Sequence, residues 1–215
     1  MLSNQLKGIY AVTDDVLTPL CSIEKNLEEA LNAGVKIIQF RDKIHTDNEI
    51  EDLTIRLQNA CRKYKALFVM NDRVELAAKL KLDAIHIGME DISLIQARNL
   101  VGNNCVIGVS CYGNIELAKK AALQGANYVA FGTCFSSPTK PQNLTIDKNV
   151  ISLAKSILNI PVCVIGGITA VNIKELQVYH PDMFAIVSAI FKGNITQNII
   201  DIQQSIKKNN NEMVR

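Results

Sequence analysis

The sequence contains no tryptophan, and aromatic residues make up only 5% of its 215 residues. So few aromatic side chains argue against a surface that stacks nucleic-acid bases. Positive and negative charges nearly cancel, with a formal net charge of +2, whereas a general nucleic-acid binder needs a concentrated basic surface. We therefore expect no nucleic-acid partner.

Long apolar runs are also missing. No run reaches the length needed to span a membrane, and residues 1–7 lack the apolar core of a signal peptide. The six cysteines form no Cys-x-x-Cys pair and have no histidine at zinc-ligand spacing. Several lie in apolar runs, where a free cysteine packs as a small hydrophobic side chain. We therefore expect a cytoplasmic protein in a reducing compartment, without a membrane partner.

Short apolar segments alternate with helical patterns along the whole chain. The expected strands lie near residues 8–13, 35–41, 66–70, 83–87, 105–109, 127–131, 161–165 and 183–187. The expected helices lie near residues 22–32, 46–60, 73–80, 93–101, 114–124, 147–158, 171–178 and 195–206. The strands are apolar and rarely alternate with polar residues, which is typical of strands buried on both faces.

This alternation predicts an α/β fold, a single (β/α)8 TIM barrel. It would occupy residues 1–206 as one catalytic domain, followed by a polar C-terminal tail at residues 207–215. A doubly wound open sheet is the structural alternative. It is weakened because no glycine-rich turn follows the first strand.

The second expected strand ends in Gln39-Phe40-Arg41-Asp42-Lys43. Alternate side chains of an extended chain share a face, so Gln39, Arg41 and Lys43 would point one way. Phe40 and Asp42 would point the other way. Two cations and an amide on one face suit an anion site, although the strand could also simply end there with solvated charges. The chemistry of the other strand ends decides between these interpretations.

All strand C-termini of a barrel meet at one mouth, where catalytic residues gather. Asp72 follows the third expected strand and Asp91 the fourth. Mg²⁺ prefers one or two carboxylates with water and phosphate oxygens, but each aspartate could instead cap the helix that follows it. With Arg41, Lys43 and Lys140, a bound Mg²⁺ would bring a diphosphate ester and two aspartates close to neutrality.

Gly166-Gly167 and Ser188 follow the seventh and eighth expected strands. Barrels often bind a phosphate there, with backbone N–H groups and a helix N-terminus. Glycine lets the backbone approach the anion closely, although two glycines can also form an ordinary turn. The mouth could thus hold a diphosphate on one side and a monophosphate on the other, as a site for two substrates.

Taken together, these motifs resemble the thiamine phosphate synthase family over nearly the whole chain except the tail. Each motif alone is weak, but their order and placement are specific. The matching segments are Tyr10-Ala11-Val12-Thr13-Asp14, Gln39 to Lys43, Asn71-Asp72-Arg73, His86-Ile87-Gly88, Gly108-Val109-Ser110, Ser137-Pro138-Thr139-Lys140, Ile165-Gly166-Gly167-Ile168 and Val187-Ser188-Ala189-Ile190-Phe191.

The resemblance implies a transferase of thiamine biosynthesis with Mg²⁺ as its cofactor. Such an enzyme couples 4-amino-2-methyl-5-(diphosphooxymethyl)pyrimidine with thiazole phosphate, by dissociative substitution, to give thiamine phosphate and diphosphate. The implied ligands of the pyrimidine diphosphate are Gln39, Arg41, Lys43, Asn71, Ser110 and Lys140, and those of Mg²⁺ are Asp72 and Asp91. The implied ligands of the thiazole phosphate are Ser137, Pro138, Thr139, Gly167, Val187 and Ser188. No covalent nucleophile is implied, and a homodimer is plausible.

Some residues depart from the family pattern. Met89 stands where glutamine is usual, and Cys111 and Tyr112 stand where threonine and histidine are common. These departures concern rate and substrate fit and remove no implied ligand. The related thiazole tautomerase family shares the barrel but loses the diphosphate and Mg²⁺ ligands, so it is the weaker alternative. A non-catalytic sensor of a phosphorylated metabolite is a second alternative, and the joint presence of Asp72 and Asp91 argues against it.

Overall fold

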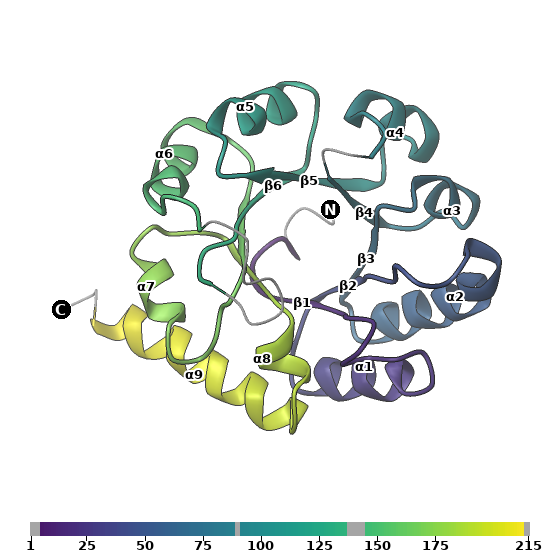
Figure 1. The fold of residues 1–215 in the computed structure, drawn as a ribbon, viewed down its shortest axis with the longest axis horizontal. Coiled ribbons are helices and arrows are strands. Elements are labelled where there is room, and N and C mark those ends of the chain that lie inside the picture. The colour runs from purple at the N-terminus through teal and green to yellow at the C-terminus, as the bar shows by residue number, and fades with distance from the viewer. Residues whose placement is uncertain (1–4, 89–90, 137–144, 213–215) are drawn as a thin grey trace.

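Figure 1 shows a computed structural model in which a ring of strands is surrounded by helices. The structure describes residues 5–88, 91–136 and 145–212. The strands are β1 Gly8–Val12, β2 Ile37–Phe40, β3 Leu67–Asn71, β4 Ala84–Ile87, β5 Val106–Tyr112, β6 Tyr128–Phe131, β7 Val162–Ile165 and β8 Met183–Ile186. The helices are α1 Ile23–Asn32, α2 Asp47–Lys63, α3 Val74–Lys79, α4 Leu94–Val101, α5 Ile115–Leu123, α6 Asn149–Ile157, α7 Ile173–Gln177, α8 Ser188–Phe191 and α9 Ile195–Glu212.

The strands form a closed parallel barrel. Each strand pairs with the next in sequence order, and β8 pairs with β1. At the closure, Ala11 of β1 lies opposite Ile38 of β2 on one side and Ile186 of β8 on the other. The predicted (β/α)8 barrel is therefore confirmed. The open doubly wound sheet is excluded, because an open sheet has two edge strands.

Successive side chains of each strand point alternately into the barrel and outward to the helices. Tyr10, Ile37 and Met183 belong to the cluster that fills the barrel interior. Their neighbours Ala11 and Ile38 belong to the larger cluster that contains the helices. Both sides of each strand are buried, which explains why the strands are apolar at nearly every position.

Helix α2 shows how the sequence starts a helix and attaches it to the barrel. Thr46 is its N-cap, as expected, and Glu49 accepts a hydrogen bond from the Thr46 backbone N–H at 2.7 Å. Ile50, Leu53 and Leu57 recur at intervals of three and four residues and are buried. The cap fixes where α2 begins, and the apolar stripe packs it against the strands.

The C-terminal region differs from the sequence-based expectation in two ways. A short additional helix, α8, begins at Ser188, directly after β8. Helix α9 continues to Glu212, past the expected end at Ile206. The apolar positions that predict α9, such as Ile199 and Ile202, give no signal beyond Ile206. Backbone hydrogen bonds nevertheless continue the helix through polar residues that were expected to lie in a tail.

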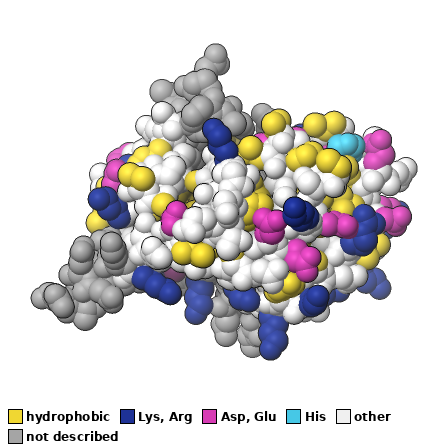
Figure 2. All heavy atoms as spheres, turned by 90° about the horizontal axis from the view of Figure 1, so that it is seen from below, with side chains coloured by type: hydrophobic (Ala, Val, Ile, Leu, Met, Phe, Trp, Pro, Cys, Tyr) yellow, Lys and Arg dark blue, Asp and Glu magenta, His cyan; other side chains and the backbone are white. Residues whose placement is uncertain are grey.

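Figure 2 shows the side of the barrel that α1 and α9 cover. Acidic, basic and apolar side chains are interspersed over most of this face, and Lys and Arg side chains gather along its lower edge. Within the described ranges, no helix is both long and apolar enough to cross a lipid bilayer.

Candidate functional site

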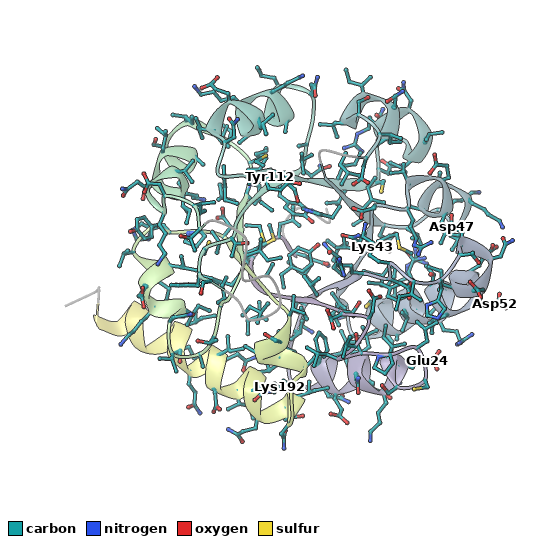
Figure 3. The ribbon with its side chains drawn as sticks, viewed as in Figure 1. Glu24, Lys43, Asp47, Asp52, Tyr112 and Lys192 are labelled. Carbon is teal, nitrogen blue, oxygen red and sulfur yellow. The ribbon has the colours of Figure 1, made fainter. Side chains whose placement is uncertain are left out.

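The end of β2 carries the first group of site residues, and it alternates as predicted. Gln39 points into the barrel, where its Nε2 donates a hydrogen bond to Tyr10 Oη at 2.8 Å. Phe40 points outward into the cluster beneath the helices. In Figure 3, Lys43 lies over the ends of β3 and β4, whereas Asp47 lies further out, among the helices. Within β2, which ends at Phe40, the period of two therefore puts Gln39 and Phe40 on opposite faces.

Lys43 belongs to a compact cluster of charges with the ends of β3 and β4. Its ammonium group forms an ion pair with Asp72. Asn71 Nδ2 donates to Asp72 Oδ2 at 2.6 Å, and the carboxyl group of Asp91 lies close enough to that of Asp72 for each to shift the pKa of the other. Asp91 Oδ2 also accepts a hydrogen bond from the Gly88 N–H at 2.6 Å. The loops after β2, β3 and β4 therefore bring together the Lys43 ammonium group, the Asn71 amide and the carboxyl groups of Asp72 and Asp91.

Neither aspartate acts as a helix cap. The N-cap of α3 is Arg73, and that of α4 is Ser93. The Ser93 hydroxyl accepts a hydrogen bond from the Gln96 N–H at 3.3 Å, so α4 has its own cap. Asp72 adopts a left-handed backbone conformation, with φ of 62°. The interpretation of Asp72 and Asp91 as simple N-caps is therefore wrong.

The two carboxyl groups have pKa values displaced in opposite directions. Burial alone would raise the pKa of Asp72, but the contacts with Lys43, Asp91 and Asn71 together outweigh burial and hold that pKa below its ordinary value. Burial and the adjacent Asp72 raise the pKa of Asp91, against the hydrogen bond from Gly88. Two carboxyl groups in contact require a shared proton or a cation between them.

This donor set fits Mg²⁺. Within the part of the chain that the structure describes, no group of three or more His, Cys, Asp and Glu side chains is placed to hold a metal ion. A fully protein-bound metal of the zinc type is therefore not built here. A pair of carboxylates is what Mg²⁺ takes from a protein when substrate phosphate and water supply its remaining ligands.

Arg41 lies beside the acidic loop that follows β1. Its Nη1 is 3.8 Å from Asp15 Oδ2, and its backbone N–H donates to Thr13 Oγ1 at 2.8 Å. The Lys43 backbone N–H donates to Asp15 Oδ1 at 3.2 Å. Asp15 thus connects to both predicted cations of β2. The one sequence signal for Asp15 is its place in Asp14-Asp15, directly after a strand.

A chain of buried hydrogen bonds joins Gln39 to Ser110 across the barrel interior. Tyr10 Oη lies 2.9 Å from Tyr128 Oη, and Tyr128 Oη lies 3.0 Å from His86 Nδ1. His86 Nε2 lies 2.9 Å from Ser110 Oγ. Burial lowers the pKa of His86 to about 4, so the imidazole is neutral at neutral pH.

Tyr10 and Tyr128, the two tyrosines of this hydrogen-bond chain, were not among the predicted site residues. Each lies in an apolar strand, where the sequence suggests only core packing. One signal was available, because a buried tyrosine hydroxyl requires a hydrogen-bond partner. Which partner it finds depends on the register of four strands and on barrel closure. Sequence periodicity does not contain that information.

The segments after β7 and β8 contain Gly166, Gly167 and Ser188, the residues predicted to bind a phosphate, which we call the phosphate cradle. Gly166 and Gly167 both have left-handed φ angles, of 107° and 63°. A Cβ on Gly167 would lie 2.8 Å from the Phe135 carbonyl oxygen. These are therefore not interchangeable turn glycines, because the backbone beside them leaves no room for a side chain. Val187 precedes α8 and Ser188 begins it, and the first N–H groups of a helix have no partner within that helix.

Four predicted ligands, Ser137, Pro138, Thr139 and Lys140, lie outside the described residues. Their roles stay predictions. The described segment before them ends at Ser136, beside Gly167. Ser136 therefore lies on the side of the mouth that carries the predicted phosphate cradle.

Cys111 follows Ser110 but does not have the properties of a nucleophile. Burial raises the pKa of its thiol to about 12, so the group is protonated at neutral pH. All six cysteines are free; Cys21 is exposed and Cys61, Cys105, Cys111, Cys134 and Cys163 are buried.

Native labelling with iodoacetamide is expected to modify Cys21 alone, since only exposed thiolates react readily. Intact-mass spectrometry should show a single adduct, and a Cys21→Ser variant should show none. Rapid modification of Cys111 in the folded protein would contradict this assignment.

Asp42 fastens the loop between β2 and α2. Its Oδ1 accepts hydrogen bonds from the backbone N–H groups of Ile44 at 3.1 Å and His45 at 2.8 Å. Arg73 Nη2 donates to the same oxygen at 3.2 Å, and Arg73 Nη1 donates to Asp47 Oδ1 at 2.5 Å. Burial alone would raise the pKa of Asp42, but hydrogen bonds from His45 and Ile44 outweigh burial and hold it below its ordinary value.

The Asp42→Asn variant is expected to be about 2–3 kcal/mol less stable than the unaltered protein at pH 7, since an amide replaces the partner of a partly buried guanidinium. The folded-state pKa of Asp42 is lowered, so its stabilisation is fully present above the ordinary carboxyl pKa of about 3.9. It is lost as the pH falls through the lowered value. The stability difference should therefore hold down to about pH 5 and shrink below about pH 4.

Urea unfolding at several pH values measures this difference. Asp52→Asn is the matched control, because Asp52 is exposed and points away from the barrel (Figure 3). Equal stability of the Asp42→Asn and Asp52→Asn proteins at pH 7 would show that Asp42 does not anchor the loop.

Several known proteins are similar to this chain. The family described as thiamine monophosphate synthase matches residues 9–190. A thiamine-phosphate synthase of Wolinella succinogenes is 42% identical over 199 residues, which cover 92% of this chain and 91% of that protein. One of Thioalkalivibrio sulfidiphilus is 37% identical over 187 residues, which cover 87% and 89%. The solved structure of a thiamine phosphate pyrophosphorylase from Pyrococcus furiosus has a TM-score of 0.86 and 30% identity, over 97% of this chain and 99% of that one.

Proposed function

The chain belongs to the thiamine monophosphate synthase family, and from this membership we propose how its own residues carry out the transfer. The enzyme is a transferase of thiamine biosynthesis. In the proposed reaction, a pyrimidinylmethyl group leaves its diphosphate and bonds to the nitrogen of thiazole phosphate, which gives thiamine phosphate and diphosphate. The cluster of Lys43, Asn71, Asp72 and Asp91 is the observation that carries this proposal.

The pyrimidine diphosphate would lie over the ends of β2, β3 and β5. Gln39 and Ser110 face the ring, because both end a buried hydrogen-bond chain and neither is charged. Arg41, Lys43 and Lys140 supply positive charge for the diphosphate, with Asn71 as an uncharged donor. Cations aimed at the leaving group stabilise the charge that develops as its C–O bond breaks.

Asp72 and Asp91 would hold Mg²⁺, since their paired carboxyl groups match the ligands that this ion takes from proteins. When bound, Mg²⁺ neutralises charge on the departing diphosphate. Lys43 forms an ion pair with Asp72. We propose that this ammonium group turns to the diphosphate when substrate enters, because a surface ion pair of this type exchanges partners at small cost.

The thiazole phosphate would bind over the ends of β6, β7 and β8. Gly167, Val187 and Ser188 offer backbone N–H groups to its phosphate, and the Ser188 hydroxyl adds a further donor. Ser137, Pro138 and Thr139 would complete this side. Binding the two substrates in adjacent places aligns the thiazole nitrogen with the pyrimidine methylene carbon, which lowers the entropic cost of their reaction.

No covalent enzyme intermediate is needed in this scheme. An electron-rich pyrimidine stabilises the positive charge left on its methylene carbon when the diphosphate departs. The thiazole nitrogen then captures that carbon. The protein therefore requires leaving-group stabilisation and alignment, and a buried Cys111 with a raised pKa fits the absence of a nucleophilic role.

Incubation of the purified protein with both substrates and Mg²⁺, followed by assay of thiamine phosphate, tests the proposal. We expect product and diphosphate in equal amounts, and neither without Mg²⁺. Interconversion of thiazole tautomers without coupling would favour an isomerase. Binding of thiazole phosphate without any turnover would favour a sensor.

A further inference from the structure

The hydrogen-bond chain beneath the mouth has an internal direction. The Gln39 side-chain nitrogen, Nε2, can only donate hydrogen bonds, so Tyr10 Oη accepts from it at 2.8 Å. Either hydroxyl could donate across the 2.9 Å between Tyr10 Oη and Tyr128 Oη. Because Gln39 already donates to Tyr10 Oη, the Tyr10 hydroxyl hydrogen has Tyr128 Oη as its acceptor among the described residues. Tyr128 in turn donates to His86 Nδ1 at 3.0 Å. An imidazole whose Nδ1 accepts a hydrogen bond carries its proton on Nε2, so His86 donates to Ser110 Oγ at 2.9 Å.

The direction of these hydrogen bonds determines which atoms Ser110 and Gln39, at the two ends of the hydrogen-bond chain, have left for a ligand in the mouth. Ser110 Oγ accepts from His86, so its own hydroxyl hydrogen is left for a group in the mouth. Gln39 uses its amide nitrogen toward Tyr10, so its Oε1 is left to accept. The chain therefore presents one acceptor and one donor, and reversal of either end would require every bond between them to reverse.

Packing holds the chain in place. The side chains of Tyr10 and Tyr128 are 1% and 0% exposed, so water does not compete for their hydroxyl groups. The His86 ring stacks on the Tyr128 ring, with centroids 5.6 Å apart. Gly108 makes room for this arrangement, since a Cβ there would lie 2.0 Å from Tyr128 Cζ. The Tyr10 hydroxyl is therefore held between Gln39 and Tyr128, and the Tyr128 hydroxyl between Tyr10 and His86.

We propose that Tyr10, Tyr128 and His86 are positioning residues that fix Ser110 as a hydrogen-bond donor, and Gln39 as an acceptor, toward the aminopyrimidine ring. An aminopyrimidine edge places an N–H donor beside a ring-nitrogen acceptor, which complements this pair. The assignment of the ring to Gln39 and Ser110 rests on the proposed function. The direction of the chain does not, because it follows from the protein's own hydrogen bonds.

The tautomer of His86 tests the direction without substrate. Nitrogen-15 NMR of the labelled protein at neutral pH should show a protonated Nε2 and an unprotonated Nδ1 for His86. A His86→Gln variant identifies its signals among those of the three histidines. A proton on Nδ1, or on both nitrogens, would overturn the proposal whatever the enzyme's activity.

Two substitutions test the positioning role. Tyr128→Phe and Tyr10→Phe each remove one hydroxyl from the chain and keep the ring. Each is expected to raise the KM for the pyrimidine diphosphate about tenfold, as one buried group loses its partner, and to leave the KM for thiazole phosphate unchanged. Calorimetry with the pyrimidine diphosphate and Mg²⁺ alone should show the same loss of affinity.

Tyr64→Phe is the matched control, because the Tyr64 hydroxyl bonds to Glu28 at the surface, 3.3 Å away. It should leave both KM values unchanged. Equal rises of both KM values in Tyr128→Phe and Tyr10→Phe, or no rise in either, would reduce the chain to a structural role. An inactive unaltered protein with the expected His86 tautomer would count against the proposed function and leave the direction of the chain established.

Discussion

The Asp72→Asn variant is expected to lose about 100- to 1,000-fold in kcat/KM, which corresponds to about 3–4 kcal/mol of transition-state stabilisation. The expected loss follows from the place of Asp72 in the cluster. Its carboxyl group contacts Asp91, Lys43 and Asn71, and it caps no helix. An amide at this position keeps the shape but removes a charge that Mg²⁺ requires.

Folding should survive this substitution. Asparagine accepts the left-handed φ of 62° at position 72 more readily than most residues. The change also removes one of two adjacent carboxyl groups, and with it their repulsion, which offsets the ion pair lost with Lys43. We therefore expect a melting temperature close to that of the unaltered protein. Raising the Mg²⁺ concentration should recover part of the activity of Asp72→Asn, because the remaining ligand, Asp91, still attracts the ion.

Activity measured against Mg²⁺ concentration, with calorimetry of Mn²⁺ binding in the presence of diphosphate, separates ligation from folding. Asp91→Asn should behave in the same way, and Asp52→Asn should change nothing. Full activity of Asp72→Asn at the Mg²⁺ concentration that half-saturates the unaltered enzyme would remove Asp72 from the metal site. A parallel loss of folded protein would return it to a structural role.

Local pattern predicted most of the barrel and one wall of its mouth. The alternation of apolar segments with helical stretches fixed the number of strands, because each strand needs a helix to cover its outer side. The period of two predicted that Gln39 and Phe40 point to opposite faces of the strand, and in the structure Gln39 points inward and Phe40 outward. It could do so because both residues belong to one strand, within which orientation depends only on position.

The pattern within one strand does not predict which side chains of different strands contact each other. The hydrogen bond between Tyr10 and Tyr128 joins residues 118 positions apart, and it forms because barrel closure brings β1 and β6 around one interior. The left-handed backbone of Asp72 is hidden for a similar reason. The identity of a single aspartate does not predict a left-handed backbone, because the surrounding contacts impose that conformation. The end of α9 was missed because polar residues carry no periodic signal.

Gly167→Ala is expected to raise the KM for thiazole phosphate about 10- to 100-fold, as about 1–3 kcal/mol of overpacking displaces the loop that would receive the phosphate. A Cβ at this position would meet the Phe135 carbonyl oxygen at 2.8 Å and the Ser136 carbonyl oxygen at 2.9 Å. Both are backbone atoms, so no side-chain rotation relieves the clash. The loops after β6 and β7 must separate, and these loops flank the predicted phosphate cradle.

Gly193→Ala isolates the backbone contribution to this effect. Gly193 also has a left-handed φ, of 85°, but a Cβ there would meet no atom within 4 Å. It should therefore cost about 1 kcal/mol of stability through strain alone and leave both KM values unchanged. Gly167→Ala should be less stable than Gly193→Ala and should weaken thiazole phosphate binding, while calorimetry shows unchanged affinity for the pyrimidine diphosphate. Matching kinetics in the two variants would mean that Gly167 is only a turn residue. Weakened binding of both substrates would mean that the two halves of the mouth are one coupled surface rather than adjacent sites.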